Sequence, residues 1–141
     1  ITKLATLTGI ARTTILAYLQ YLHEAKLIRL LYSDDLSVKK MQKPDKILME
    51  NTNLLQALSL QVPNIGTMRE TFFCNQLGYT HQVEYNKRGD YLIDHKYVFE
   101  IGGKAKDGKQ VANIENAYIA SDECDYPIGN KLPLWLFGLM Y

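Results

Sequence analysis

An acidic residue interrupts the most strand-like part of this sequence. The stretch YVFEIGGKAKDGK, residues 97–109, starts as an apolar strand, but Glu100 lies within it and two glycines and a lysine follow. Successive side chains of a strand point to opposite faces, so Glu100, Gly102 and Lys104 are expected to share one face. The acid is therefore either a solvent-facing residue of an edge strand or a residue placed to bind a cation.

Three strand-like segments in this region predict an antiparallel meander. They are QVEYN, DYLID and YVFEI, separated by the turns NKRGD and DHK. An amphipathic helix, TMRETFFCNQLGY, precedes them. Thr67 is its expected N-cap, Glu70 stands three residues later at the capping-box position, and Gly78 ends the helix.

The segments after the meander complete a layered unit. A helix is expected over residues 110–121 and a last strand over the apolar tail, residues 132–141. Helix, three strands, helix and strand in this order form an α/β/α arrangement.

The N-terminal third predicts a helix-turn-helix followed by a β-hairpin. A short helix over residues 3–8 is followed by Gly9 and by a longer helix over residues 11–28, whose apolar residues recur at helical spacing. Two short strands around the turn SDDLS come next. We interpret these elements as a winged-helix domain over residues 1–50, with a second domain over residues 51–141. Any helical hairpin followed by a β-hairpin would give a similar pattern.

The longer helix carries the residues that would meet DNA. A recognition helix presents its N-terminal residues to bases and phosphates. The residues expected to bind nucleic acid are Arg12, Thr13 and Thr14 at the start of the helix, and Lys39 and Lys40 in the wing. Further along, Tyr18, Tyr21 and Glu24 do not form a basic face, and many winged helices pack on proteins instead. Contact with DNA and contact with a protein therefore both stay open.

Asp90 and Asp94 share a face of the strand that precedes Glu100, so one of these acids is expected to lie near Glu100 if the strands pair around DHK. Two neighbouring carboxylates repel each other, and a divalent cation between them removes that cost. Mg²⁺ typically takes one or two carboxylates together with waters and phosphate oxygens. Lys104 would then stabilise a metal-bound hydroxide or the charge that develops on phosphate. The two glycines would let a phosphodiester backbone approach closely.

This order of residues resembles the PD-(D/E)xK nuclease core, in which a helix Glu precedes a meander that carries an Asp and then an acid and a Lys at a strand end. The resemblance implies a restriction-endonuclease-like fold with Mg²⁺ as cofactor. It assigns metal binding to Asp90 and Glu100, and catalysis to Lys104, Glu70 and Gln110. The motif separates its acid and lysine by one residue, whereas EIGGK separates them by three, and a glycine rather than a proline precedes Asp90.

The chain as a whole resembles the C-terminal region of prokaryotic P-loop ATPases of the AAA type, in which a winged helix and a nuclease-like domain of unknown function follow the ATPase domain. The segments that carry this resemblance are KPDKILMENTNLLQAL, GTMRETFFCNQL and GDYLIDHKYVFEIGGKAKDGKQ. The resemblance implies an ATPase domain outside this sequence as a partner, besides DNA. ATP would bind only in that domain, since no GxxxxGK[ST] motif occurs here.

The composition is that of an ordinary globular chain. Of its 141 residues 47% are apolar and 22% charged, and the net charge of +1 argues neither for nor against a nucleic-acid partner. Cys74 and Cys124 lie far apart without ligands at zinc-binding spacing, so we expect neither a disulfide scaffold nor a zinc site, and a cytoplasmic location. The apolar tail is shorter than the roughly 20 residues that span a bilayer. The chain starts at Ile1 within a helical pattern and reads as a fragment.

Three functions agree with these observations. The first is a Mg²⁺-dependent nuclease module coupled to an ATPase, which requires that the acids converge. The second is a non-catalytic DNA-binding or regulatory module with a degenerate nuclease-like core, in which the acids would be splayed apart and the winged-helix face would be basic. The third is a protein-interaction module that uses Tyr18 and Tyr21. We favour the nuclease-like fold combined with the second function.

Overall fold

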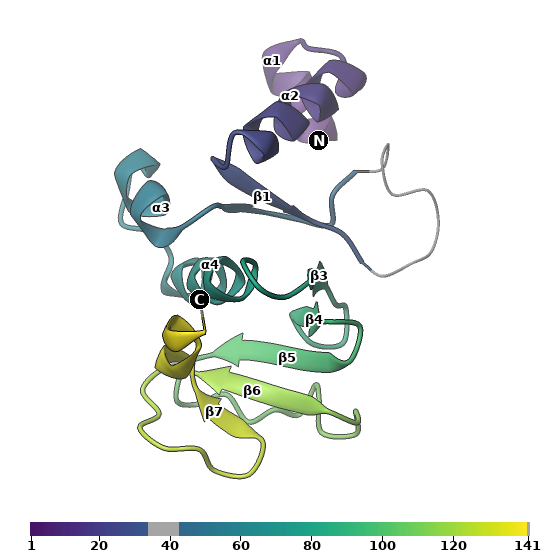
Figure 1. Ribbon diagram of the computed structural model, residues 1–141. Helices are drawn as coiled ribbons and strands as arrows, with labels where there is room; N and C mark the ends of the chain where they lie inside the picture. Colours follow the sequence, from purple (N-terminus) through teal and green to yellow (C-terminus); the bar gives the residue numbers. More distant parts are fainter. Residues whose placement is uncertain (34–42, 141) are drawn as a thin grey trace.

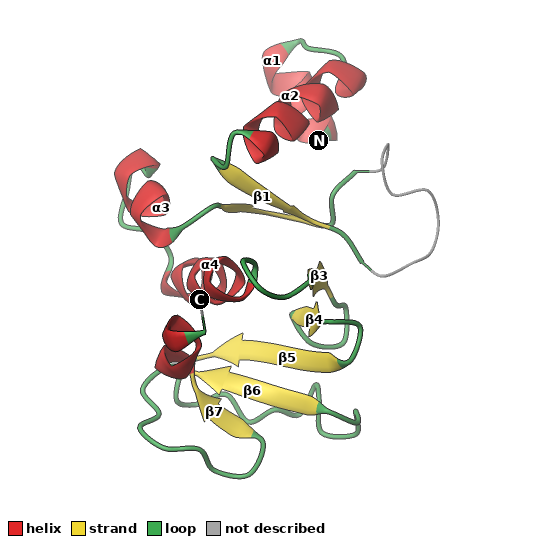
Figure 2. Cartoon of the chain, in the orientation of Figure 1, coloured by secondary structure: helices red, strands yellow, loops and turns green. Residues whose placement is uncertain are grey.

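The structure, a computed structural model, describes residues 1–33 and 43–140. It is a mixed α+β protein, as expected, with a two-stranded sheet toward the N-terminus and a five-stranded sheet toward the C-terminus (Figure 1, Figure 2).

The N-terminal part consists of two helices and two paired strands, as expected, but the second helix is shorter than the predicted range 11–28, and the expected turn SDDLS lies outside the described residues beyond Ser33. Helix α1 (Thr2–Thr8) ends at Gly9, whose φ of 68° is left-handed and therefore suits glycine. Helix α2 (Arg12–Glu24) follows. Strands β1 (Ile28–Leu31) and β2 (Lys46–Met49) pair antiparallel.

Two helices connect the hairpin to the larger sheet. They are α3 (Thr52–Leu58) and α4 (Ile65–Leu77). Helix α4 begins earlier than expected, because the side chain of Asn64 accepts hydrogen bonds from two backbone N–H groups of its first turn. Thr67 therefore lies inside the helix rather than at its N-cap, which corrects the expected start. Gly78 is the C-cap, as expected.

The larger sheet has the strand order β3-β4-β5-β6-β7. Its strands are β3 (Val83–Tyr85), β4 (Tyr91–Ile93), β5 (Tyr97–Gly102), β6 (Ala117–Ser121) and β7 (Lys131–Pro133). Strands β3, β4 and β5 are antiparallel neighbours, which confirms the meander, whereas β5, β6 and β7 run parallel. The parallel step requires that the chain cross one face of the sheet between β5 and β6.

The helix expected over residues 110–121 is wrong. Its last five residues form the buried strand β6, and turns occupy the segment before it. Asn116 lies at a φ of 56°, which no α-helix accommodates, directly before the strand begins. The sequence AYIAS contributes side chains to both faces of the sheet, and this burial outweighs the helical spacing of the apolar residues ahead of it.

The last strand is also shorter than expected. Strand β7 ends at Pro133, and the 3₁₀ helix η2 (Leu134–Leu139) replaces the predicted strand. Leu134 and Phe137 are buried, and their spacing of three residues places both on one side of a 3₁₀ turn. The tail therefore closes the core as a helix that packs beside α4.

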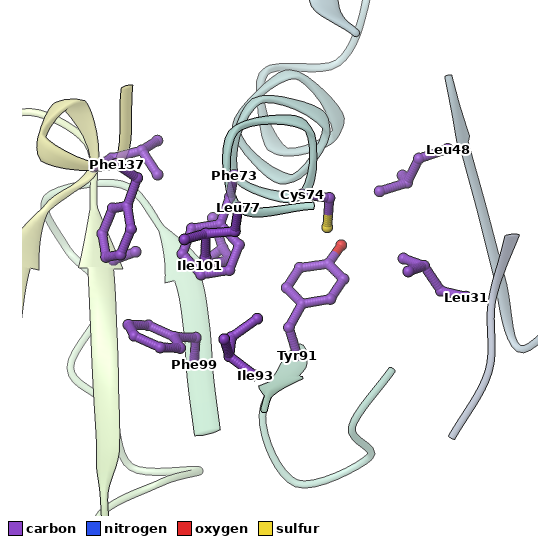
Figure 3. Close-up of a cluster of buried hydrophobic side chains, with 12 residues drawn as sticks. Leu31, Leu48, Phe73, Cys74, Leu77, Tyr91, Ile93, Phe99, Ile101 and Phe137 are labelled. Atoms are coloured by element: carbon purple, nitrogen blue, oxygen red, sulfur yellow. The ribbon is translucent and has the colours of Figure 1, made fainter. Parts of the chain in front are cut away.

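Aromatic residues form the centre of the core between α4 and the sheet (Figure 3). Phe73 of α4 contacts Phe99 of β5 and Phe137 of η2, with ring centroids 5.1 and 4.8 Å apart. Tyr91 is fully buried, and its hydroxyl points toward the sulfur of Cys74. Burial raises the pKa of the Cys74 thiol to about 12, so this cysteine stays protonated. Both cysteines are free, as expected.

The N-terminal hairpin shares this core. Leu31 of β1 and Leu48 of β2 are buried in the same cluster as Phe73 and Tyr91. Ser33 continues from β1 into a parallel bridge with Tyr85 of β3. The hairpin therefore packs against the second half of the chain, and the division into domains 1–50 and 51–141 stays a prediction.

Because the core is shared, truncating Leu48 is expected to destabilise the whole chain. Leu48→Ala removes a side chain that is only 5% exposed and should lower the free energy of unfolding by about 2–5 kcal/mol. Ile47→Ala is the matched control, because Ile47 is the preceding residue of the same strand and is 40% exposed. Urea denaturation followed by tryptophan fluorescence and by circular dichroism should show one shifted transition. Two separate transitions, with only one of them shifted, would contradict a shared core.

Candidate functional site

Glu100 lies on the face of the sheet that α4 does not cover. Its neighbours Phe99 and Ile101 belong to the core under α4, so the alternation along β5 turns Glu100 to the other face, beside Val98. Glu100 is nevertheless only 1% exposed. Of the two alternatives for Glu100, the solvent-facing edge residue is therefore wrong: the acid lies on a central strand and is buried.

Lys106 is the partner of this buried acid. Its Nζ lies 2.9 Å from Oε1 of Glu100. The hydrogen bond to Glu100 is the main reason why the pKa of the Lys106 ammonium is raised above 10.5, and the charge of Asp90 contributes in the same direction. The Lys106 ammonium therefore stabilises the charged form of the carboxylate that it contacts.

A glycine makes room for this lysine. A Cβ added to Gly102 would lie 2.9, 3.0 and 3.0 Å from Cγ, Cβ and Cδ of Lys106. The Lys106 side chain thus fills the space that a side chain at position 102 would occupy. Position 102 is separated from Glu100 by one residue, which is the spacing of the acid and the lysine in the nuclease motif. The lysine therefore reaches this place from the following loop rather than from the strand.

Asp90 lies at the start of β4, next to Glu100. Its backbone N–H donates to the carbonyl of Phe99 (2.8 Å), and its Oδ2 accepts from the N–H of Ile101 (2.6 Å). The N–H of Ile101, the residue after Glu100, thus donates to the Asp90 side chain rather than to a backbone carbonyl of the neighbouring strand. The turn before it is held by Asn86, whose Oδ1 accepts from the N–H of Gly89 (3.1 Å).

One oxygen of the Glu100 carboxylate has no hydrogen-bond partner among residues 1–33 and 43–140. Oε2 is buried and accepts no hydrogen bond from any residue that the structure describes. A buried carboxylate oxygen without a donor costs free energy, and a bound cation would remove this cost. The described residues contain no group of three or more His, Cys, Asp and Glu side chains that could hold a metal ion. Two carboxylates suffice for Mg²⁺, which completes its shell with waters and phosphate oxygens. The acids at this position fit such an ion.

The second glycine of the pair is also covered. A Cβ at Gly103 would lie 3.2 Å from the guanidinium of Arg69, which reaches it from α4. Arg69 is itself paired with Asp122 at the end of β6, with Nε and Oδ2 3.0 Å apart. The expectation that the glycines leave space for a phosphodiester backbone is therefore wrong, because two cationic side chains fill that space.

Three residues predicted to be catalytic lie elsewhere. Strand β5 ends at Gly102, so Lys104 does not continue its face; it is exposed, and its carbonyl accepts from Lys131. Glu70 pairs with Lys46 of β2 (2.6 Å) on the α4 side of the sheet. Gln110 is exposed in a turn of the β5–β6 loop, where the expected helix is absent. Of the predicted set, the structure brings together Asp90 and Glu100.

The residue that the sequence reasoning missed is Lys106. The segment GGKAK offers two lysines, and strand alternation favoured Lys104. The strand ends before either lysine, and the turn from Gly103 to Lys106, with a 3.0 Å hydrogen bond, redirects the chain. The sequence signal for this lysine was Gly102, because a glycine two residues after the acid leaves space on the same face for a side chain from elsewhere.

Of the residues predicted to contact DNA, Arg12, Thr13 and Thr14 lie at the start of α2. Arg12 and Thr13 are exposed and Thr14 is half-buried. Lys39 and Lys40 lie outside the described residues. Tyr18 and Tyr21, the alternative contact residues, are 51% and 63% exposed.

Comparison with known proteins identifies no relative. The chain matches no family model, no curated protein and no solved structure. Among the described residues, no helix is long and apolar enough to cross a membrane. The functional argument therefore depends on the geometry of Asp90, Glu100 and Lys106.

Adding a methyl group at position 102 is expected to displace Lys106. Gly102→Ala would place its Cβ against the near end of the lysine side chain, so the ammonium must leave Glu100, and we expect a loss of about 1–3 kcal/mol in unfolding free energy. Gly103→Ala is the matched control, because it meets only the tip of Arg69, which can shift. Neither glycine has a left-handed φ, so backbone strain does not separate the two variants. Equal stability of the variants in urea denaturation would contradict the role of Gly102.

Proposed function

We propose that this chain is the C-terminal nucleic-acid-binding module of a larger prokaryotic ATPase, acting in the cytoplasm, and that Asp90, Glu100 and Lys106 form its nuclease-type Mg²⁺ site. The observation that carries this proposal is the buried Glu100 carboxylate, with Lys106 on one oxygen and, among the described residues, no partner on the other. ATP is expected to bind only in the ATPase domain, which is a partner that the resemblance implies.

The order of elements supports a nuclease-like fold for the second half of the chain. Helix α4 is followed by the antiparallel strands β3, β4 and β5 and by the parallel strand β6. The acids lie at the start of β4 and within β5, as in the PD-(D/E)xK order. The irregular loop between β5 and β6 departs from it. The lysine reaches the site from this same loop.

In this proposal the two acids would bind the metal ion and Lys106 would stabilise charge on the phosphate. Asp90 Oδ1 and Glu100 Oε2 are the oxygens that remain for a cation, since Oδ2 and Oε1 are already bound. Bound Mg²⁺ would neutralise phosphate charge at this position. The Lys106 ammonium, held against Glu100, would place a second positive charge near that phosphate. The β5–β6 loop that brings Lys106 would have to stay in place while nucleic acid binds.

The N-terminal part supports nucleic-acid binding of the winged-helix type. Helix α2 begins with Arg12 and Thr13, both exposed, and in the part of the chain that the structure describes no side chain caps its first turn. The free N–H groups and the arginine suit a phosphate. In this account α2 binds the nucleic-acid backbone and the Mg²⁺ site lies on a separate surface of the same chain.

A second candidate function is the degenerate module without cleavage. Lys106 already neutralises one charge of the acid pair, as a structural ion pair would. In this case the chain would bind nucleic acid through α2 and regulate the ATPase without cutting.

Metal titration separates these functions. We expect Mn²⁺ or Mg²⁺ to bind the purified chain in calorimetry, and Asp90→Asn and Glu100→Gln each to weaken binding by at least tenfold, since even outer-shell substitutions cost about 10–100-fold. Glu115→Gln is the control, because Glu115 is exposed outside the site. Cleavage of plasmid DNA or RNA that follows the same pattern would support the nuclease. Metal binding without cleavage favours the degenerate module, and no metal binding by the unaltered chain would overturn the proposed site.

A further inference from the structure

The loop between β5 and β6 crosses the charged face of the sheet and carries Lys106 to Glu100. Strand registers define a row of residues on this face: Glu100 pairs with Ile119, and Ile119 pairs with Lys131 on the far side of β6. Gly108 of the loop passes over this row so closely that a Cβ there would lie 2.3 Å from Ile119. Lys131 thus stands at the edge strand, on the same face as Glu100, beneath the crossing loop.

The ammonium of Lys131 is bound to the loop backbone. Its Nζ donates to the carbonyl of Lys104 at 2.7 Å and lies 3.4 Å from the carbonyl of Lys106. These carbonyls belong to the turn from Gly103 to Lys106, which is closed by the hydrogen bond from Lys106 N–H to the carbonyl of Gly103 (3.0 Å). Charge-assisted hydrogen bonds of this kind are stronger than neutral ones. Lys131 therefore holds, by two hydrogen bonds, the backbone segment from which the Lys106 side chain extends.

The backbone of Lys131 is itself held. Its N–H donates to the carbonyl of Ile128 (3.0 Å), and its own carbonyl accepts from the N–H of Ile128 (2.9 Å). The preceding residue, Asn130, accepts from Ile119 N–H of β6 (2.9 Å). The loop is thus bound to a residue whose backbone is held in strand β7.

We propose that Lys131 is the positioning residue of the acid–lysine site: by holding the carbonyls of Lys104 and Lys106 it keeps the Lys106 ammonium on Glu100. This inference rests on the proposed function for its consequence, because the position of Lys106 matters for catalysis or metal binding only if the site is used. The structural part of the inference, that Lys131 controls where Lys106 lies, holds independently of any metal or nucleic acid.

Lysine reactivity tests the structural part directly. Competitive acylation of the whole chain, followed by mass spectrometry, gives the rate at which each amine reacts. In the unaltered chain the paired Lys106 should react more slowly than the exposed Lys104, which serves as an internal reference two residues away. In Lys131→Met the rate of Lys106 should rise toward that of Lys104. Lys131→Arg keeps a charged donor and should keep Lys106 slow, and Lys131→Gln should lie between.

The control substitution is Lys109→Met, in the same loop. Lys109 is 87% exposed and pairs only with Asp107 among the described residues, so its loss should leave the Lys106 rate unchanged. An unchanged Lys106 rate in both Lys131→Met and Lys131→Gln would overturn the proposal. So would a rise in Lys131→Arg as large as in Lys131→Met, because this would show a general loosening of the fold.

Metal affinity tests the functional part. If Lys131 acts through Lys106, the double variant Lys106→Met/Lys131→Met should bind Mn²⁺ with the same affinity as Lys106→Met alone. If the affinity changes of the two single variants add up in the double variant, Lys131 does not act through Lys106, and positioning is contradicted. If the unaltered chain binds no Mn²⁺, the proposed function fails, while the acylation rates still decide whether Lys131 positions Lys106.

Discussion

The burial of the Glu100 carboxylate on a central strand is the constraint from which the rest of the site follows. An acid at this position costs several kcal/mol of desolvation unless a cation or hydrogen-bond donors meet it. Lys106 supplies the cation at 2.9 Å, and it can do so only because Gly102 leaves its side-chain space empty. The loop between β5 and β6 is irregular where an α/β/α unit would have a helix, and its turn brings the lysine back over the strand that it has just left.

The two faces of the larger sheet differ in the side chains that they bury: one is aromatic and apolar, and the other carries the acid–lysine pair. On one face, α4 and η2 close over Phe73, Phe99 and Phe137, and this aromatic packing holds the strands in a fixed register. On the other face a smaller apolar cluster lies beside the acids and the lysine. The aromatic core therefore fixes the position of Glu100 on the opposite face, because Glu100 follows the core residue Phe99 directly on β5. A site supported in this way can hold its geometry with few residues of its own.

Sequence patterns predicted the elements whose burial is local and periodic, which include α2, the hairpin, most of α4 and the β3–β4–β5 meander. Strand pairing around DHK left Asp90 and Asp94 open as the acid beside Glu100, and the nuclease resemblance selected Asp90, while Asp94 pairs with His81. The sequence patterns failed where long-range packing decides. Residues 110–116 have apolar residues at helical spacing, yet they form turns that cross the sheet, because the following residues AYIAS are buried as strand β6. Lys106 was missed for the same reason: strand alternation says nothing about a side chain that returns from a loop.

The pH dependence of the Lys106–Glu100 pair tests the central claim most directly. The pKa of Lys106 is raised above 10.5 by Glu100, so its contribution to stability is present at neutral pH and is lost as the pH rises through the folded-state pKa. The measurement is the unfolding free energy of the unaltered chain and of Lys106→Met, from neutral pH to beyond pH 10.5, with Lys104→Met as control. We expect the unaltered chain to be more stable than Lys106→Met by about 1–3 kcal/mol at neutral pH, with the difference vanishing at high pH. Equal stability at neutral pH, or a difference that does not change with pH, would contradict the account.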